Sequence, residues 1–314
     1  MGNEYQQALI KIEAAIRRNP NDAQGYYARG YCYLGMGQTA RAISDFDKAI
    51  RLDPSEADAY LYRAVAYRNL KQYDQALADA DGAVRLRPRN AGMYFERGVA
   101  YYNMKQYDRA ITDFDAAIRL NPNYAEAYYN RGYAYRTLEQ YERALPDLDT
   151  AIRLKSDYAR AYLERGYAHV YFGRNEQAVA DFDAAIRLDP HDADGHYSRG
   201  FTFDSLEQYD RAIADYDEAI RLRPDYADAH WKRGYLYLRR EDYDRALADF
   251  DEVIRLTPDN WLTYYNRGYV YYQLEEYDRA LANFDAAIRL NPENVAMRET
   301  RENTYRFIQE QNDA

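Results

Sequence analysis

The sequence is poor in the residues that build disulfide-bonded, metal-bound or membrane-spanning proteins. It has a single cysteine, Cys32, so no disulfide can form within the chain, as is usual in a reducing compartment. Four histidines and one cysteine show no metal-ligand spacing. No apolar run is long enough to span a membrane, and the first twenty residues mix charges where a secretory signal would be apolar. We therefore expect a cytoplasmic protein without a membrane span, metal or cofactor; a targeting segment ahead of Met1 remains open.

Positive charge is also in deficit. The chain has 42 Lys and Arg against 52 Asp and Glu, a formal net charge of −10. Nucleic acids are bound by basic surfaces that release counterions from phosphates, so we expect no nucleic-acid partner. The sequence has no glycine-rich phosphate loop, no nucleophile elbow and no CxxC motif. We expect no catalytic residues and no enzymatic activity.

Proline is scarce but regularly spaced. Eight of the nine prolines are separated from one another by 34 residues or by a multiple of 34, as Pro88 and Pro122 are. Ser156 occupies the one place in this series that has no proline. This period predicts eight repeats over residues 23–294, preceded by a half-repeat capping helix at 1–22 and followed by a polar capping helix at 295–314. The prolines of the series are Pro20, Pro54, Pro88, Pro122, Pro190, Pro224, Pro258 and Pro292.

Each repeat has the pattern of two helices. With Ala125 as position 1 of its repeat, positions 2–14 and 17–30 show helical periodicity, and a short turn falls at Glu139 and Gln140. The second helix ends before the Asn-Pro or Asp-Pro pair, because a residue that precedes proline is driven out of the helical region. No stretch alternates as a strand does, so the sequence predicts an all-α protein.

The repeat resembles the tetratricopeptide repeat (TPR) family, in the form of a bacterial-type array. In the fourth repeat the resemblance rests on Tyr128, Gly132, Tyr135, Ala144, Leu148 and Ala151. It implies a right-handed superhelical solenoid of stacked antiparallel helix pairs, whose first helices line a concave groove. The chain departs from the family at position 7, where the usual leucine before the glycine is an arginine in every repeat.

The 37 tyrosines divide between two helix faces. At about 100° per residue, positions 3, 4, 7, 8 and 11 of the first helix share one face, and alanine or glycine at positions 3 and 8 marks it as the packed side. We predict that the tyrosines of positions 4, 11 and 17 belong to the core; examples are Tyr60, Tyr67, Tyr73, Tyr94, Tyr101, Tyr107, Tyr128, Tyr135, Tyr141, Tyr209, Tyr243 and Tyr277.

The opposite face of the first helix is also aromatic. Positions 5 and 9 are i, i+4 neighbours and hydrophobic throughout, with a margin of charged and amide side chains. Aromatic anchors inside a polar rim are typical of protein-binding surfaces, although these rows could instead pack partly on neighbouring repeats. The candidate groove residues are Tyr27, Tyr31, Phe95, Tyr129, Asn130, Tyr133, Arg136, Tyr167, Tyr197, Phe201, Trp231, Lys232, Tyr235, Tyr265, Asn266 and Tyr269.

The arginine at position 7 lies on the packed side, where a cation must be paired or must extend outward. The second helix carries aspartates at both edges of its apolar stripe, Asp113 and Asp115 in one repeat and Asp147 and Asp149 in the next. We predict that each arginine reaches one of these aspartates across the helix pair. This structural ladder comprises Arg29, Arg63, Arg97, Arg131, Arg165, Arg199, Arg233 and Arg267.

The fourth and fifth repeats depart from the pattern together. Pro146 interrupts a second helix, and Ser156, His169 and Asn175 replace a proline and two tyrosines. We predict a local change of curvature near residues 145–175, which either shapes a pocket or reflects drift of the array. His196 and His230 take position 4 and are expected at the edge of the core.

The two ends are expected to cap the array. Ala8, Ile12, Ala15 and Ile16 should face the first full repeat, and Met297 and Tyr305 should point inward from the last helix. The leading hypothesis is a scaffold or adaptor that binds a protein or peptide segment in its aromatic groove. Two alternatives are a scaffold that self-assembles through its ends or edges, and the docking region of a larger enzyme or regulatory complex. We expect a monomer, with a homo-oligomer as the alternative.

Overall fold

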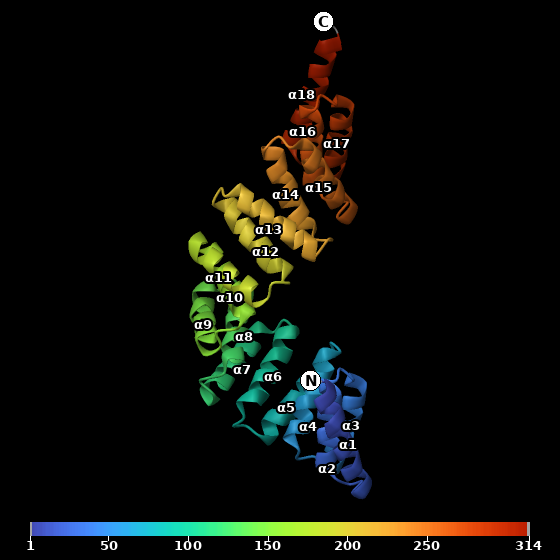
Figure 1. Ribbon diagram of the computed structural model, residues 1–314, viewed down its shortest axis with the longest axis vertical. Helices are drawn as coiled ribbons and strands as arrows, with labels where there is room; N and C mark the ends of the chain where they lie inside the picture. The colour runs from blue at the N-terminus through green and yellow to red at the C-terminus, as the bar shows by residue number, and fades with distance from the viewer. Residues whose placement is uncertain (1, 313–314) are drawn as a thin grey trace. The chain divides into compact units, whose positions relative to one another are not determined.

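The computed structural model describes residues 2–312, and over that range the chain forms eighteen α-helices and no strand (Figure 1). Figure 1 shows the helices succeeding one another as antiparallel pairs, each pair stacked on the next within a unit. The chain divides into two compact units, Met1–Ala168 and His169–Ala314. The helices are α1 (Gly2–Arg18), α2 (Ala23–Gly35), α3 (Thr39–Leu52), α4 (Ala57–Asn69), α5 (Tyr73–Leu86), α6 (Ala91–Asn103), α7 (Tyr107–Leu120), α8 (Ala125–Thr137), α9 (Tyr141–Leu154), α10 (Ala159–Tyr171), α11 (Asn175–Leu188), α12 (Ala193–Ser205), α13 (Tyr209–Leu222), α14 (Ala227–Arg239), α15 (Tyr243–Leu256), α16 (Trp261–Gln273), α17 (Tyr277–Leu290) and α18 (Val295–Asn312).

The helix boundaries follow the sequence pattern closely. The second helices occupy positions 17–30 as predicted, while the first helices begin and end one residue earlier than predicted. The turn between them places position 15 in the left-handed region, for example at Glu139 with φ of 59° and at Gly173 with φ of 66°. The all-α solenoid class predicted from the sequence is confirmed. Within the described residues, no helix combines the length and apolarity that crossing a bilayer requires.

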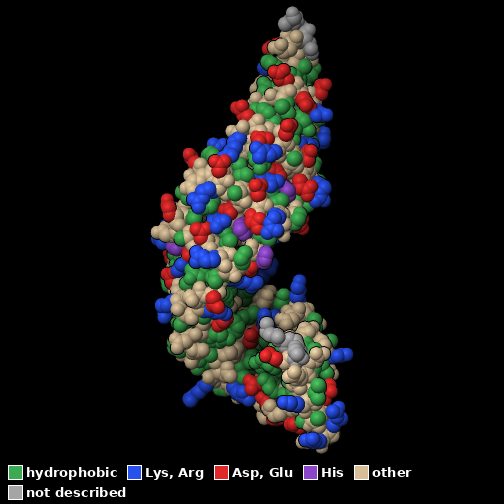
Figure 2. Space-filling view, in the orientation of Figure 1, with side chains coloured by type: hydrophobic (Ala, Val, Ile, Leu, Met, Phe, Trp, Pro, Cys, Tyr) green, Lys and Arg blue, Asp and Glu red, His purple; other side chains and the backbone are tan. Residues whose placement is uncertain are grey.

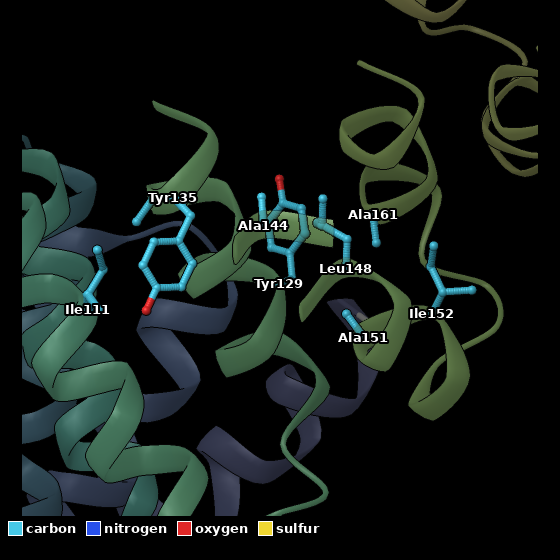
Figure 3. Close-up of a cluster of buried hydrophobic side chains, with 9 residues drawn as sticks. Ile111, Tyr129, Tyr135, Ala144, Leu148, Ala151, Ile152 and Ala161 are labelled. Atoms are coloured by element: carbon cyan, nitrogen blue, oxygen red, sulfur yellow. The ribbon is translucent and has the colours of Figure 1, made fainter. Parts of the chain in front are cut away.

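The centre of a helix pair is built from alanines and, in every repeat but the second, one large side chain at position 24. Leu148 of α9 has no exposed surface and lies beside Tyr129, Ala144 and Ala151 in Figure 3. Phe46, Phe114, Phe182, Phe250 and Phe284 occupy the same position in other repeats and are likewise fully buried. Interhelical contact is close here because position 8 has no large side chain: a Cβ placed on Gly98 would lie 2.7 Å from the ring of Phe114.

Most tyrosines of positions 4, 11 and 17 are half-buried, so their assignment to the core was only partly right. Tyr135 is an exception, with 6% of its surface exposed. The rings of position 4 lie beneath the guanidinium group of position 7; the Arg97 guanidinium carbon is 5.4 Å from the centre of the Tyr94 ring. A phenol that contacts a cation and keeps its hydroxyl near water is best placed at the edge of the core.

Several arginines of position 7 bind aspartates on two neighbouring repeats. Arg97 donates from Nε and Nη2 to Asp113 of its own repeat, both at 2.7 Å, and from Nη1 to Asp81 of the preceding repeat at 3.0 Å. The same two-sided arrangement holds for Arg63, Arg131, Arg199 and Arg233. The sequence predicted one aspartate for each arginine, and the second contact couples successive repeats.

The histidines of position 4 replace tyrosine without leaving the core edge. His230 is 8% exposed, and its Nδ1 lies 2.9 Å from Asp249 Oδ1 while its Nε2 lies 3.1 Å from the carbonyl of Pro224. Tyr94 makes the equivalent contact in its own repeat by donating its hydroxyl to the carbonyl of Pro88. His230 therefore performs a structural task that tyrosine performs elsewhere.

Pro146 lies inside α9, which continues without a break from Tyr141 to Leu154. Pro146 has no N–H to donate to the carbonyl of Glu142, so the helix continues with one backbone hydrogen bond fewer. The proposed change of curvature near residues 145–175 stays a prediction.

The end helices only partly match the expectation. Ile16 of α1 is buried but Ala15 is exposed. In α18, Met297 is buried as predicted, whereas Tyr305 is 45% exposed and the prediction that it points inward is wrong. Arg301 explains the difference: it bonds Asp285 at 3.0 Å as a position-7 arginine would, so α18 has the register of a first helix. Among the described residues no second helix follows to cover Tyr305.

Candidate protein-binding face

Positions 5 and 9 of the first helices form the surface that the sequence singled out, here called the first-helix face. In the unit Met1–Ala168 it is carried by α2, α4, α6 and α8, and in the unit His169–Ala314 by α12, α14 and α16. Successive first helices contact each other in the pairs α2–α4, α4–α6, α6–α8 and α14–α16. Neighbouring first helices therefore lie side by side from α2 to α8 in the first unit and at α14 and α16 in the second.

The rings of position 5 are anchored in the core. The Phe95 ring lies 5.9 Å from that of Phe114 at position 24 and 4.9 Å from that of Tyr124 at the end of the repeat. Tyr129, at the same position one repeat later, is only 8% exposed and lies 4.7 Å from Tyr158. The partial packing that the sequence left open is present, so position 5 contributes ring edges rather than free rings.

The rings of position 9 are more accessible. Tyr31, Tyr235 and Tyr269 are 41%, 37% and 40% exposed. Tyr235 lies parallel to Trp231, with ring centres 5.4 Å apart and planes at 4°. The packed ring of position 5 thereby holds the accessible ring of position 9 in a fixed orientation, and this reduces the entropy lost when a ligand binds.

In the unit Met1–Ala168 much of this face is occupied by its own side chains. Arg136 forms an ion pair with Glu164, and its guanidinium lies 5.0 Å from the Tyr133 ring and 5.6 Å from the Tyr167 ring. Tyr133 also contacts Tyr102, with ring centres 5.2 Å apart. These rings and charges are engaged with one another, which leaves fewer groups for a ligand.

The Glu164 carboxylate is buried beneath this cluster, with 7% of the residue exposed. Burial raises the pKa of Glu164 to about 7, and the attraction of Arg136 offsets this only in part. Arg68 and Glu96 form an ion pair of the same kind two repeats earlier, at 3.3 Å. Burial raises the pKa of Glu96 as it does that of Glu164. Each pair joins position 12 of one first helix to position 6 of the next.

The unit His169–Ala314 instead has a cleft between α14 and α16. Its volume is about 440 Å³, within the range of about 300–1,000 Å³ typical of ligand pockets. Three of the predicted groove tyrosines and Asn266 are among the side chains that line it. The lining consists of Tyr235, Leu238, Arg239, Glu241, Tyr243, Tyr265, Asn266, Tyr269 and Gln273.

Asn266 is the most unusual residue of the cleft. It is 7% exposed, and within the described part of the chain its Nδ2 has no hydrogen-bond acceptor. The asparagine at the same position of an earlier repeat, Asn130, donates its Nδ2 to the carbonyl of Glu126 at 2.7 Å. A buried donor without an acceptor costs about 1–3 kcal/mol, and a ligand carbonyl would recover this if the side chain rotated toward the cleft.

Charged groups at the edge of the cleft are of both signs. Arg239 donates to the hydroxyl of Tyr209 at 3.0 Å, and Glu241 lies in the turn that follows α14. Lys232 lies over the rings of Phe201 and Trp231, at 4.6 and 5.7 Å from their centres. Figure 2 shows acidic and basic side chains interspersed over the visible face rather than gathered into a patch of one sign.

Five lining residues were not among the predicted groove residues. Leu238, Arg239, Glu241 and Gln273 fall at the end of the first helix or in the turn, and Tyr243 had been assigned to the core. The helical wheel could not indicate them, because the turn bends position 15 and position 17 back toward the next first helix. No cluster of three or more His, Cys, Asp or Glu side chains suited to a metal occurs within residues 2–312.

Comparison with known proteins identifies the family. Models described as "Tetratricopeptide repeat" match residues 12–44, 33–91, 125–158, 202–261 and 234–303, and one described as "TPR repeat" matches 104–138 and 170–206. The chain belongs to the tetratricopeptide repeat family. No curated protein matches it significantly.

Solved structures with similar folds are numerous. A tetratricopeptide repeat protein from Parabacteroides merdae matches at TM-score 0.57 and 20% identity, covering 79% of this chain and 98% of that one. PilF of Pseudomonas aeruginosa matches at TM-score 0.60 and 22% identity, covering 64% and 92%. MamA from Desulfovibrio magneticus matches at TM-score 0.50 and 25% identity, covering 54% and 96%. The first two show the fold; the family supports a role in protein–protein interaction.

Proposed function

We propose that the protein is a non-catalytic scaffold that binds a segment of a partner protein on its first-helix face, with the cleft between α14 and α16 as the principal site. The observation that supports this most strongly is the combination of accessible, oriented rings with the buried, unpaired amide of Asn266 in one cleft. Tyrosine, tryptophan and arginine are the residues that carry most binding energy at protein interfaces. The contact would extend to the other candidate groove residues of the same unit, Tyr197, Phe201, Trp231 and Lys232.

The test compares matched variants of the same repeat position. Tyr235→Ser and Tyr269→Ser remove accessible rings of the cleft, while Tyr31→Ser removes an equally exposed position-9 ring in the other unit. Proteins captured from a lysate of the source cells by the parent chain should be lost with the two cleft variants and retained with Tyr31→Ser, and circular dichroism should show all three folded. If the same partners are captured by every variant, the cleft is not the binding site.

Self-assembly is a second candidate, because α1 has the register of a second helix and α18 that of a first helix. Two copies joined through these helices would complete one more helix pair. Two side chains oppose this union: Glu302 takes the small-residue position 8, and Lys11 takes position 23, which elsewhere holds the acidic or amide partner of the arginine. Light scattering over a range of concentrations distinguishes the candidates, since a scaffold of the first kind stays at one mass. A third candidate, the docking region of a larger enzyme or regulatory complex, would bind its partner in the same cleft.

A further inference from the structure

We propose that the cleft between α14 and α16 takes a proline-rich segment in the polyproline II conformation. This inference rests on the proposed function and adds the composition and backbone conformation of the partner. Three features of the cleft carry it: its size, its aromatic ring surfaces and its unpaired hydrogen-bond donor.

The size of the cleft favours an extended segment over a helix. One turn of an α-helix with its side chains is about 10–12 Å across and 5.4 Å long, which corresponds to roughly 400–600 Å³. The cleft of about 440 Å³ would hold a single turn, too little for a stable helical contact. About four residues fit in this volume in any conformation. The contacts of a PxxP segment fall within four residues, whereas those of a helix in a groove, at i, i+3, i+4 and i+7, span two turns.

The walls offer the surfaces that proline rings prefer. Tyr235 is accessible and held parallel to Trp231, while Tyr265 is fixed against Phe284 with ring centres 5.7 Å apart. Tyr269 adds a second accessible ring. Grooves lined by oriented aromatic rings recognise polyproline II segments, because the rigid ligand loses little entropy when its pyrrolidine rings pack on the aromatic faces.

The cleft has one buried donor without an acceptor and further N–H groups. The amide of Asn266 lacks an acceptor, and Arg239 and Gln273 bring further N–H groups, whereas Glu241 is the one carboxylate in the lining. A polyproline II segment has free carbonyls and, at each proline, no N–H. A strand-like segment without proline would bring as many N–H groups as carbonyls and would need an acceptor for each of them.

The charges argue against a strongly charged ligand. Lys232 is engaged with the rings of Phe201 and Trp231, and Arg239 is balanced by Glu241 in the same lining. An acidic or basic peptide would therefore gain little net attraction. A neutral proline-rich segment suits a lining whose positive and negative charges offset each other.

The test is a fluorescence anisotropy titration of the full chain with two labelled peptides, both acetylated, amidated and eight residues long. One consists of proline, and in the other every second proline is alanine, which restores N–H groups and removes rings. The proline peptide should bind about tenfold more tightly, and Asn266→Leu and Tyr235→Ser should each weaken it about tenfold. The matched variants Asn130→Ala and Tyr31→Ser should leave its binding unchanged, and circular dichroism should show every variant folded.

The outcomes separate this inference from the proposed function. Equal binding of the two peptides overturns the preference for polyproline II while leaving the cleft a peptide site. Failure of both peptides, with capture from lysate still dependent on Tyr235 and Tyr269, overturns the inference and leaves the scaffold role intact. Failure of both peptides with capture independent of those rings overturns both. Binding that Asn130→Ala or Tyr31→Ser weakens as much as the cleft variants do also overturns the inference.

Discussion

Arg131 and Asp147, sixteen residues apart, form an ion pair with two hydrogen bonds, Nε to Oδ2 at 2.7 Å and Nη2 to Oδ1 at 2.6 Å. The remaining guanidinium nitrogen, Nη1, contacts Asp115 of the preceding repeat. The side chain of Asp147 is 7% exposed, so little water could replace the arginine. One guanidinium group therefore ties together the two helices of its repeat and the second helix of the repeat before.

Removal of this arginine should destabilise the fold. Arg131→Met keeps the aliphatic stem but leaves the buried Asp147 carboxylate without its partner, and we expect the free energy of unfolding to fall by about 1–3 kcal/mol in urea titrations. The double variant Arg131→Met with Asp147→Asn should recover part of this loss, because a neutral amide is less costly to bury than a carboxylate.

The last full repeat provides a natural control. Arg267 has Asn283 in place of the buried aspartate, with Nε donating to Oδ1 at 2.8 Å. Arg267→Met should therefore cost less than Arg131→Met. A loss for Arg131→Met within about 0.5 kcal/mol of zero, the usual range of surface substitutions, would show that the ladder does not stabilise the array.

The contact between position 8 and position 24 leads to a second prediction. A Cβ on Gly98 would meet the Phe114 ring at 2.7 and 2.9 Å, so Gly98→Ala should cost about 1–3 kcal/mol through overpacking. The second repeat already has alanine at both positions, Ala64 and Ala80, and both are buried. The double variant Gly98→Ala with Phe114→Ala should cost less than the sum of the two single variants, as measured by a double-mutant cycle in urea. Additive costs would mean that the two positions do not share space.

The sequence predicted those features that repeat and depend on near neighbours. The 34-residue period, the helix bounds to within one residue and the Arg–Asp contacts all follow from proline spacing, helical periodicity and the cost of an unpaired charge. The depth of each tyrosine was less predictable. A helical wheel places Tyr94 on the packed face of its helix and Tyr129 on the opposite face. The burial of each ring depends on the group that covers it, which is a guanidinium for Tyr94 and the Tyr158 ring for Tyr129.

The candidate site was predictable as a surface but not as a cleft. The sequence predicted the lining tyrosines of positions 5 and 9, because aromatic side chains stand out on a helix face that would otherwise be polar. Glu241 and Tyr243 enter the lining through the backbone of the turn. The unpaired amide of Asn266 depends on a side-chain conformation that differs from that of Asn130, and no pattern of residues encodes that difference.

The turn between the two helices gives a third prediction. Glu139 has φ of 59°, a conformation that is unfavourable for side chains with a Cβ, so Glu139→Gly should stabilise the fold by about 0.5–1 kcal/mol. Gly37 occupies the equivalent place with φ of 73°, and a Cβ added there would meet no atom within 4 Å, so Gly37→Ala tests the backbone effect alone. It should destabilise the fold by about 1 kcal/mol in thermal or urea unfolding. Opposite signs are expected for the two variants, and equal signs would contradict the backbone explanation.

The buried carboxylate of Glu164 makes stability depend on pH. Its pKa is raised from 4.5 to about 7, chiefly by burial, so the folded state holds this proton more tightly than the unfolded state does. The resulting stabilisation is fully present below about pH 4.5 and is lost as the pH rises toward 7, at up to about 1.4 kcal/mol per pH unit. Glu164→Gln keeps the side chain neutral at every pH, so its stability relative to the parent should rise between pH 5 and pH 7.

The measurement is a pair of urea titrations, at pH 5 and pH 7, on the parent, Glu164→Gln and Glu126→Gln. The last variant removes the same charge from an exposed side chain on a neighbouring first helix, where it pairs with Lys155 at 3.2 Å. The free-energy difference between parent and Glu164→Gln should change by about 2–3 kcal/mol over this interval, whereas that for Glu126→Gln should change little, because exposed pairs contribute about 0–1 kcal/mol. A constant difference for Glu164→Gln would mean that Arg136 keeps the carboxylate ionised throughout, and that this ion pair, like the arginine ladder, stabilises the contact between neighbouring repeats at neutral pH.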